Sequence, residues 1–176
     1  QGKDRIDQES LPLNGVFTRS ASFSGRGVNV YSLDTGIFKE HQQFSNRAEY
    51  GGNFITNDND SDTDHDDWDW NGHGTHGAAI IAGETVGIAQ NAHIWSVKIL
   101  SGSGRGSTAS MIRGIQWAVD HADGKKGVMV IAAGTETTSD VVNLAVTEAS
   151  GEGLTVIVAA GNSNVNACSV SPAAAG

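Results

Sequence analysis

The sequence predicts a three-layer α/β domain, in which a mostly parallel sheet is flanked by helices. Short apolar, β-branched runs alternate along the chain with longer segments whose apolar residues recur at helical spacing. Apolar strands that alternate with amphipathic helices favour a parallel sheet covered on both faces. Glycine is abundant, at 23 of 176 residues, and separates these segments as expected for tight turns. The expected strands are Val28–Asp34, Ile94–Leu100, Val128–Ala132 and Leu154–Ala160.

Two helices are expected between the later strands. Segment Ser107–Ala122 places Met111, Ile115 and other apolar residues at helical spacing, with Ser107 or Thr108 as the N-cap. Segment Ser139–Ser150 repeats this pattern behind a serine cap. In such a sheet the active groups gather at the carboxyl ends of the strands.

Length and composition narrow the possible functions. A chain of 176 residues and 18.3 kDa suffices for one domain. With 11 basic and 20 acidic residues its formal charge is −9, and it lacks the basic patch of a nucleic-acid binder. No apolar run is long enough for a membrane span. The N-terminus does not read as a signal peptide, so we expect a cytosolic or an already processed chain. One cysteine excludes a disulfide framework within the chain.

Seven of the twenty carboxylates crowd into the segment Asn57–Trp70. One interpretation is a solvated polar loop. The other is a calcium site, because Ca²⁺ takes six to eight oxygen ligands and Asp and Asn supply them. The spacing is not that of an EF-hand, since Gly and Glu are missing from the required positions. We expect calcium in this loop.

Three polar residues stand at the ends of expected elements. Asp34 closes the first strand, His73 lies in Asn-Gly-His-Gly-Thr-His, where it would project from the first turn of a helix that starts there, and Asn162 follows the fourth strand. Taken singly, Asp34 and Asn162 are typical turn residues, and His73 is typical of a structural histidine. His73 and His76 do not have the spacing of a zinc-protease helix. Together, a carboxylate that orients a histidine and an amide donor make up most of an acyl-transfer site.

These residues resemble the subtilisin-like serine proteases, and within them the proteinase K and aqualysin-like branch. The similarity extends along essentially the whole chain. The segments that carry it are Gly2–Gln8 (GKDRIDQ), Gly25–Ile37 (GRGVNVYSLDTGI), Asn71–His76 (NGHGTH), Ala159–Asn162 (AAGN) and Asn166–Pro172 (NACSVSP).

The resemblance implies roles for the matching residues. His73 would be the general base and then the acid, Asp34 would orient its ring, and Asn162 would donate to the oxyanion. The implied substrate-binding residues are Leu100, Gly102, Ala132, Ala133, Gly134, Ala160 and Gly161. The family usually has Ser-Leu-Gly-Gly where this chain has Ala132-Ala133-Gly134-Thr135.

The family's nucleophile is a serine in a Gly-Thr-Ser-Met-Ala motif, which residues 1–176 do not contain. Gly106–Met111 looks similar, but it lies at the start of the helix Ser107–Ala122. We therefore expect residues 1–176 to be the N-terminal part of one peptidase domain, truncated before its C-terminal strands and nucleophile helix. Two alternatives remain: an inactive truncated homologue that binds peptides in a calcium-dependent way, and a half-enzyme completed by a second chain.

The resemblance also implies cofactors and partners. Asp4, Asp7, Gln8 and Asn14 match an N-terminal structural calcium site, and Asp58 and Asp60 match a second one. Asp62–Asp69 look like an insertion whose role the family does not explain. Cys168 would pair with a cysteine further along. The implied protein is secreted, is a monomer when complete, acts on polypeptides, and has a pro-domain or protein inhibitor as its partner; no organic cofactor is implied.

Overall fold

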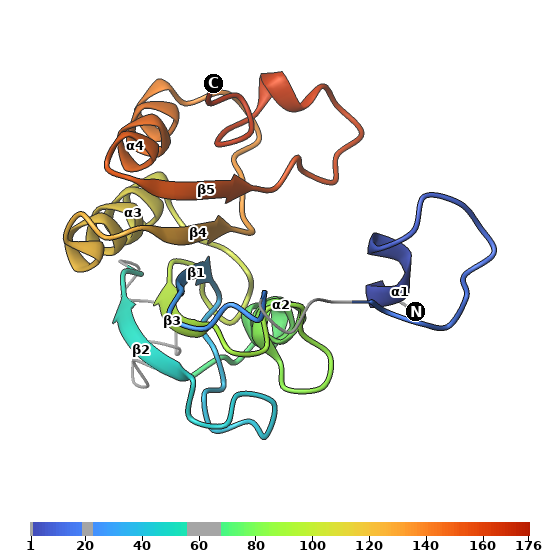
Figure 1. Cartoon of the computed structure of the whole chain (residues 1–176). Helices are drawn as coiled ribbons and strands as arrows, with labels where there is room; N and C mark the ends of the chain where they lie inside the picture. The colour runs from blue at the N-terminus through green and yellow to red at the C-terminus, as the bar shows by residue number, and fades with distance from the viewer. Residues whose placement is uncertain (1, 19–22, 56–67) are drawn as a thin grey trace.

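The computed structural model describes residues 2–18, 23–55 and 68–176. Five strands form one sheet in the order β2-β3-β1-β4-β5, and each pairing between neighbours is parallel (Figure 1). The predicted α/β class is therefore confirmed. The strands are β1 (Asn29–Asp34), β2 (Ala48–Asn53), β3 (His93–Lys98), β4 (Gly127–Ile131) and β5 (Leu154–Val158). The helices are α1 (Gly2–Ile6), α2 (His73–Ala82), α3 (Thr108–Ala122), α4 (Asp140–Gly151) and the short 3-10 helix η2 (Ala167–Ser169).

Strand β1 lies at the centre of the sheet. It pairs with β3 on one side, where Asp34 is opposite Lys98, and with β4 on the other, where Leu33 is opposite Ile131. Every residue of β1 after Asn29 is buried. The central position thus places a carboxylate, Asp34, in the protein interior at the carboxyl end of the sheet.

Alternate residues of β1 face two separate hydrophobic cores. Tyr31 and Leu33 belong to the larger core, under α3 and α4, whereas Val30 belongs to the smaller core on the α2 side. The helices therefore cover both faces, as predicted (Figure 1). The buried helical residues of the larger core are Met111, Ile115, Ala118, Ala122, Val142, Val146 and Ala149.

The N-termini of α3 and α4 are capped differently. Ser107 Oγ accepts a hydrogen bond from Ser110 N at 3.0 Å, which confirms the predicted cap of α3. Ser139 precedes α4 as predicted, but its side chain makes no cap hydrogen bond. Instead, Ser139 N donates to Ser171 Oγ at 2.8 Å, so a residue 32 positions away holds this end of the helix.

Strand β2 is not predicted from the sequence. Its residues, Ala-Glu-Tyr-Gly-Gly-Asn, include two glycines, and the strand is the sheet's edge, paired with β3 through an irregular register between Tyr50 and Gly52. Strand β3 ends at Lys98 rather than at Leu100, because the backbone N–H groups of Ile99 and Leu100 both turn to Asp34 O.

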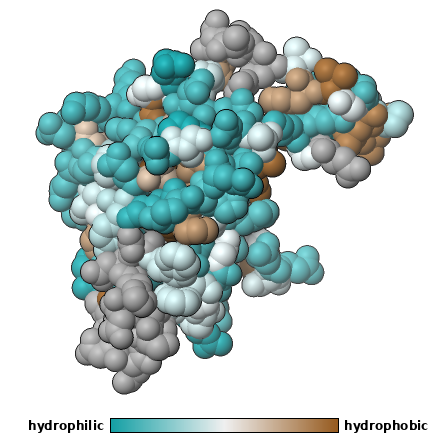
Figure 2. Space-filling model, turned by 90° about the horizontal axis from the view of Figure 1, so that it is seen from below, coloured by the Kyte–Doolittle hydropathy of each residue, from teal (hydrophilic) through white to brown (hydrophobic). Residues whose placement is uncertain are grey.

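The N-terminal segment projects from the sheet domain as an arm (Figure 1). Lys3 Nζ donates to Thr85 O at 2.7 Å and ties the arm to the domain. Hydrophobic side chains gather on the arm, as Figure 2 shows, and Ile6, Leu11 and Val16 are exposed there. Within the described ranges, no helix has the length and apolar character needed to cross a membrane.

Candidate active site

Asp34 and His73 meet at the carboxyl end of β1. His73 is the first residue of α2, and its Nδ1 lies 2.7 Å from Asp34 Oδ1 and 2.9 Å from Oδ2. Asp34 is 1% exposed, whereas the His73 side chain is 56% exposed. The structure thus brings together the two residues that the sequence analysis paired, with a buried carboxylate behind an accessible imidazole.

Burial raises the pKa of Asp34, and the hydrogen bonds from His73 and from Thr35 N oppose this rise. Thr35 N donates to Asp34 Oδ1 at 2.6 Å. A carboxylate can only accept hydrogen bonds. When Asp34 is ionised, Nδ1 of His73 is therefore the protonated nitrogen, and Nε2 of a neutral ring carries a free lone pair.

Two glycines allow α2 to start against β1. Gly72, just before the helix, has φ of 90°, a conformation that favours glycine. A Cβ at Gly74 would lie 2.1 Å from Gly36 O and 3.1 Å from Asp34 Cβ. Only glycine at position 74 lets the first turn of the helix approach this closely, and that approach carries His73 to Asp34.

Asp69 is a buried carboxylate at this junction, and the sequence analysis gave it no role. Its Oδ1 accepts from Thr35 Oγ1 at 2.8 Å, and its Oδ2 accepts from Thr75 Oγ1 at 2.6 Å. Burial raises the pKa of Asp69, but these hydroxyls and the backbone donors of Gly72 and Thr75 together hold it below its ordinary value. One sequence signal distinguishes Asp69 from the other acidic residues of the segment. It lies two residues before Asn71-Gly72, a position from which an Asp side chain can cap a turn.

A cleft of about 650 Å³ opens beside His73. Leu100, Ala132, Ala133 and Gly134, which the resemblance names as substrate-binding residues, are among the residues that line it. Gly102 is not among the lining residues. Its carbonyl oxygen instead accepts from Asn71 Nδ2 at 2.8 Å, so Gly102 supports the loop that precedes His73.

Asn162 lies beyond the end of β5, and its side chain is exposed. Strand β4 separates β5 from the strand that carries Asp34. Ala160 and Gly161 are exposed in the same segment and do not line the cleft. In the described part of the chain, no hydrogen bond joins Asn162 to Asp34 or His73, so its role remains a prediction.

The predicted N-terminal calcium ligands lie in the projecting arm. Asp4 is buried, its Oδ2 accepts from Gly15 N at 2.9 Å, and its buried Oδ1 has no hydrogen-bond partner among the described residues. Asn14 Oδ1 accepts from Val16 N, and Gln8 Oε1 accepts from Asn14 N. Asp7 Oδ2 accepts from Thr18 N. In residues 2–18, 23–55 and 68–176, no three His, Cys, Asp or Glu side chains converge on a metal position.

The other predicted calcium ligands, Asp58 and Asp60, lie outside the described residues. Cys168 is an exposed free thiol in the structure.

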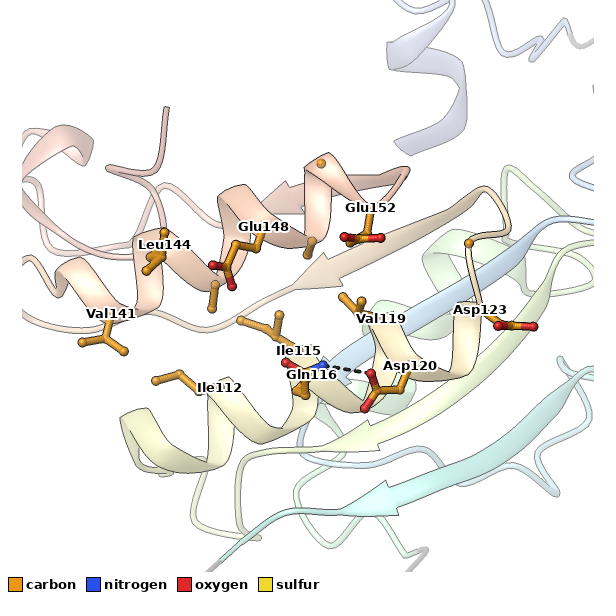
Figure 3. Close-up of a pocket in the computed structure, with 14 residues that line it drawn as sticks. Ile112, Ile115, Gln116, Val119, Asp120, Asp123, Val141, Leu144, Glu148 and Glu152 are labelled. Carbon is orange, nitrogen blue, oxygen red and sulfur yellow. Dashed lines mark hydrogen bonds between the residues drawn. The ribbon is translucent and has the colours of Figure 1, made fainter.

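A second hollow, of about 880 Å³, lies between α3 and α4 and shares no lining residue with the cleft. Apolar side chains of Ile112, Val141 and Leu144 gather at one end, as Figure 3 shows. The acidic residues toward the other end are Asp120, Asp123 and Glu152, and Glu148 lies between the two ends.

A parallel α/β sheet with an Asp–His pair at the carboxyl end of its central strand has the features of an acyl-transfer enzyme. Comparison with known proteins specifies the class further. The Peptidase S8 subtilase family matches residues 25–175, and the chain belongs to this family. The resemblance and fold expected from the sequence are therefore confirmed.

Two of the relatives are named as serine proteases. "Alkaline serine exoprotease A" of Vibrio alginolyticus is 40% identical over 98% of this chain, and "Extracellular serine proteinase" of Thermus sp. (strain Rt41A) is 41% identical over 98%. The crystal structure of a cold adapted subtilisin-like serine proteinase is 41% identical and superposes with a TM-score of 0.85, covering 97% of this chain and 59% of that one. The chain spans 30% and 40% of the two named relatives' own lengths.

Proposed function

We propose that the chain supplies the Asp and His of an Asp-His-Ser triad in a subtilisin-like serine endopeptidase. The observation that carries this proposal is the contact between His73 Nδ1 and the buried Asp34 carboxylate. It leaves Nε2 as the basic nitrogen of an accessible ring. A serine hydroxyl needs such a base beside it to act as a nucleophile.

The chemistry assigns each group a step. The serine, on polypeptide outside these 176 residues, attacks the peptide carbonyl carbon while His73 Nε2 takes its proton. The imidazolium then gives that proton to the leaving amine, and the acyl-enzyme forms. Water, deprotonated by the same nitrogen, attacks the ester carbonyl carbon; the bond to the serine oxygen breaks, and that oxygen takes the proton back from the imidazolium. Asp34 stays ionised throughout and stabilises the imidazolium. Asn162 is the proposed oxyanion donor; subtilisin itself is the established example of such an amide, worth roughly 10²–10³ in rate.

The proposed substrate is an extended polypeptide that pairs with the backbone of Ala132–Gly134 by β-addition. The cleft between this segment and Leu100 supports the proposal, because it leads to His73. Thr135 N donates to Ser171 O at 2.7 Å, which anchors the end of the segment to the body of the domain.

Calcium is the proposed structural cofactor. The buried Oδ1 of Asp4, which has no hydrogen-bond partner in the part of the chain that the structure describes, supports a cation at the arm, since a buried carboxylate oxygen without a donor is costly. Asp7, Gln8 and Asn14 would complete this site, and Asp58 and Asp60 would form the other. When bound, Ca²⁺ would stabilise the arm through electrostatic attraction to its carboxylates.

We further propose an extracellular monomer, in line with the name of the Thermus relative. A pro-domain or protein inhibitor is the proposed partner. The hollow between α3 and α4 supports such a partner, because the exposed apolar side chains of Val141 and Leu144 lie at one end of it and a bound protein would bury them.

The test is labelling of the natural protein that contains this chain with a fluorophosphonate probe in calcium, read by intact mass. The probe marks a serine activated by a neighbouring base. Label on a species heavier than 18.3 kDa, or on a separate partner chain, supports the proposal. A folded protein that takes no label contradicts it and favours the peptide-binding homologue. Label within residues 1–176 contradicts the location of the serine.

A further inference from the structure

Asp69 accepts five hydrogen bonds within the protein, although it belongs to an acidic segment that the sequence presents as either a solvated loop or a calcium site. It is 8% exposed. Its donors are Thr35 Oγ1 at 2.8 Å, Asn71 N at 3.1 Å, Gly72 N at 2.9 Å, Thr75 N at 2.9 Å and Thr75 Oγ1 at 2.6 Å. An ionised carboxylate offers about four lone-pair sites, so these donors saturate it. Asp69 is therefore an anchor inside the protein and not part of a hydrated rim.

The donors come from two separate elements. Thr35 follows β1 directly, next to Asp34, whereas Asn71, Gly72 and Thr75 surround His73 at the start of α2. The two carboxylate oxygens of Asp69 accept from different donors. Oδ1 accepts from Thr35 and from the turn before the helix, and Oδ2 accepts from Thr75 in the first turn of the helix. A residue that only capped the helix would not need to reach across to the end of β1.

The hydroxyl groups continue the connection. Thr35 Oγ1, which donates to Asp69, accepts from Gly74 N at 3.0 Å. Thr75 Oγ1 likewise donates to Asp69 and accepts from Phe38 N at 2.9 Å. Thr35 O accepts from the buried Lys98 Nζ at 2.5 Å, which fixes the same residue to β3. Asp69 is thus the centre of a network that spans the strand end, the helix start and the loop after Gly36.

We propose that Asp69 is a positioning residue, which locks the start of α2 to the end of β1 so that His73 Nδ1 stays on the Asp34 carboxylate. It acts through His73 and has no contact with substrate. The favourable interaction of a carboxylate with the N-terminus of a helix strengthens the lock. The effect of Asp69 on catalysis rests on the proposed function. Its effect on the position of His73 does not depend on that function.

The test is NMR of the natural protein that contains this chain, observing the low-field Nδ1 proton of His73, which reports the hydrogen bond to Asp34. Asp69→Asn keeps the size of the side chain but replaces one acceptor oxygen by a donor. We expect this variant to lose or broaden the low-field signal and to shift the neutral ring to a mixture of tautomers. The matched control is Asp140→Asn, an exposed aspartate in the first turn of α4, which should leave the signal unchanged.

Chemical denaturation shows whether each variant is folded. A folded Asp69→Asn protein with the wild-type His73 signal overturns the proposal. If Asp69→Asn does not fold, Thr35→Val serves as the test. This variant removes the hydrogen bond from Thr35 Oγ1 to Asp69, whereas the backbone donors at the start of α2 still reach Asp69. Folded Thr35→Val should weaken the low-field signal, and Thr35→Ser, which restores a hydroxyl, should recover it. A Thr35→Val signal equal to that of the wild type overturns the proposal.

These outcomes are separate from those of the serine-labelling experiment. A protein that takes no fluorophosphonate label but loses the His73 signal in Asp69→Asn retains the positioning role without protease function. A labelled enzyme whose His73 signal survives Asp69→Asn retains the protease function without the positioning role.

Discussion

Asp34 Oδ1 lies 2.7 Å from His73 Nδ1, although the two residues are 39 positions apart and belong to different elements. The carboxylate is in the protein interior and the imidazole is at the surface of a cleft. The contact forms because the central strand β1 ends at Asp34 in the protein interior and because helix α2 begins, with His73, beside that strand end.

Replacing Asp34 by Asn should reverse the tautomer of His73. The amide can present a donor to Nδ1, which would then become an acceptor and leave Nε2 protonated. In the protein that carries this chain and its serine, kcat should fall by roughly 10⁴, as in the established chymotrypsin-type case. Nitrogen chemical shifts of the ring and the rate of peptide hydrolysis measure the two effects. An active Asp34→Asn enzyme would contradict the role given to Asp34.

Stability should depend on the ionisation of Asp34 in a defined direction. Its pKa is raised by burial, so the folded state binds this proton more tightly than the unfolded state does. The contribution of Asp34 to stability is therefore present at low pH and is lost as pH rises through the raised pKa. The free energy of unfolding of Asp34→Asn, relative to wild type, should increase over that range. Urea unfolding at several pH values measures it, and a constant difference would contradict the burial argument.

Asp69 should show the opposite dependence, because its pKa is lowered in the folded state. Its stabilisation is present above the ordinary carboxyl pKa and is lost as pH falls through the lower folded value. At neutral pH we expect Asp69→Asn to cost about 2–4 kcal/mol, since buried donors lose their acceptor. The same urea series should find that the cost shrinks in acid. A cost that persists unchanged in acid would rule out the ionised carboxylate as its source.

Gly74→Ala should disrupt the junction between α2 and β1. The added Cβ would lie 2.1 Å from Gly36 O, so either the helix or the loop must move. We expect a loss of about 1–3 kcal/mol, together with weakening of the His73 signal. The matched control is Gly77→Ala in the same helix, where the nearest atom, Asp34 Oδ2, is 4.0 Å from the new Cβ. That variant should gain up to about 1 kcal/mol from helix propensity. Equal destabilisation by both variants would contradict the steric argument.

Calcium should raise the thermal stability of the chain. At a Ca²⁺ concentration of about 100 Kd, binding to the folded state adds about 2.7 kcal/mol. For a chain of this size, that corresponds to a rise in Tm of about 5–10 °C. Asp4→Asn should reduce the rise, whereas the exposed Asp140→Asn should not. Scanning calorimetry with Ca²⁺ and with Mg²⁺ measures these shifts, and an unchanged response in Asp4→Asn would exclude the arm as a calcium site.

Much of this arrangement could be predicted from the sequence, for identifiable physical reasons. The buried strand β1 carries the apolar residues Val30, Tyr31 and Leu33, and α3 has both apolar periodicity and a serine cap. Such local signals predict elements well. Strand β2 could not be predicted, because its two glycines and half-exposed edge position leave neither an apolar run nor a clear alternation.

The site was predictable only in part. His73 and Asp34 stand in recognisable motifs at the ends of predicted elements. Asp69 has the same residue type as the acids before it, and its burial depends on donors from Thr35, 34 positions away, which no local pattern reveals. The substrate contact expected of Gly102 stays a prediction, and the bond that its carbonyl oxygen accepts from Asn71, 31 positions away, has no local signal in the sequence.

The most direct test of the central claim is the nitrogen chemical shifts of the His73 ring in the wild-type chain, measured at a pH where the imidazole is neutral. We predict a ring protonated on Nδ1, with an unprotonated Nε2, because among the described residues the partner of Nδ1 is a carboxylate, which can only accept. This is the form that can take a proton from a serine. A ring protonated mainly on Nε2 would contradict the account, since Asp34 would then not be holding His73 as a base.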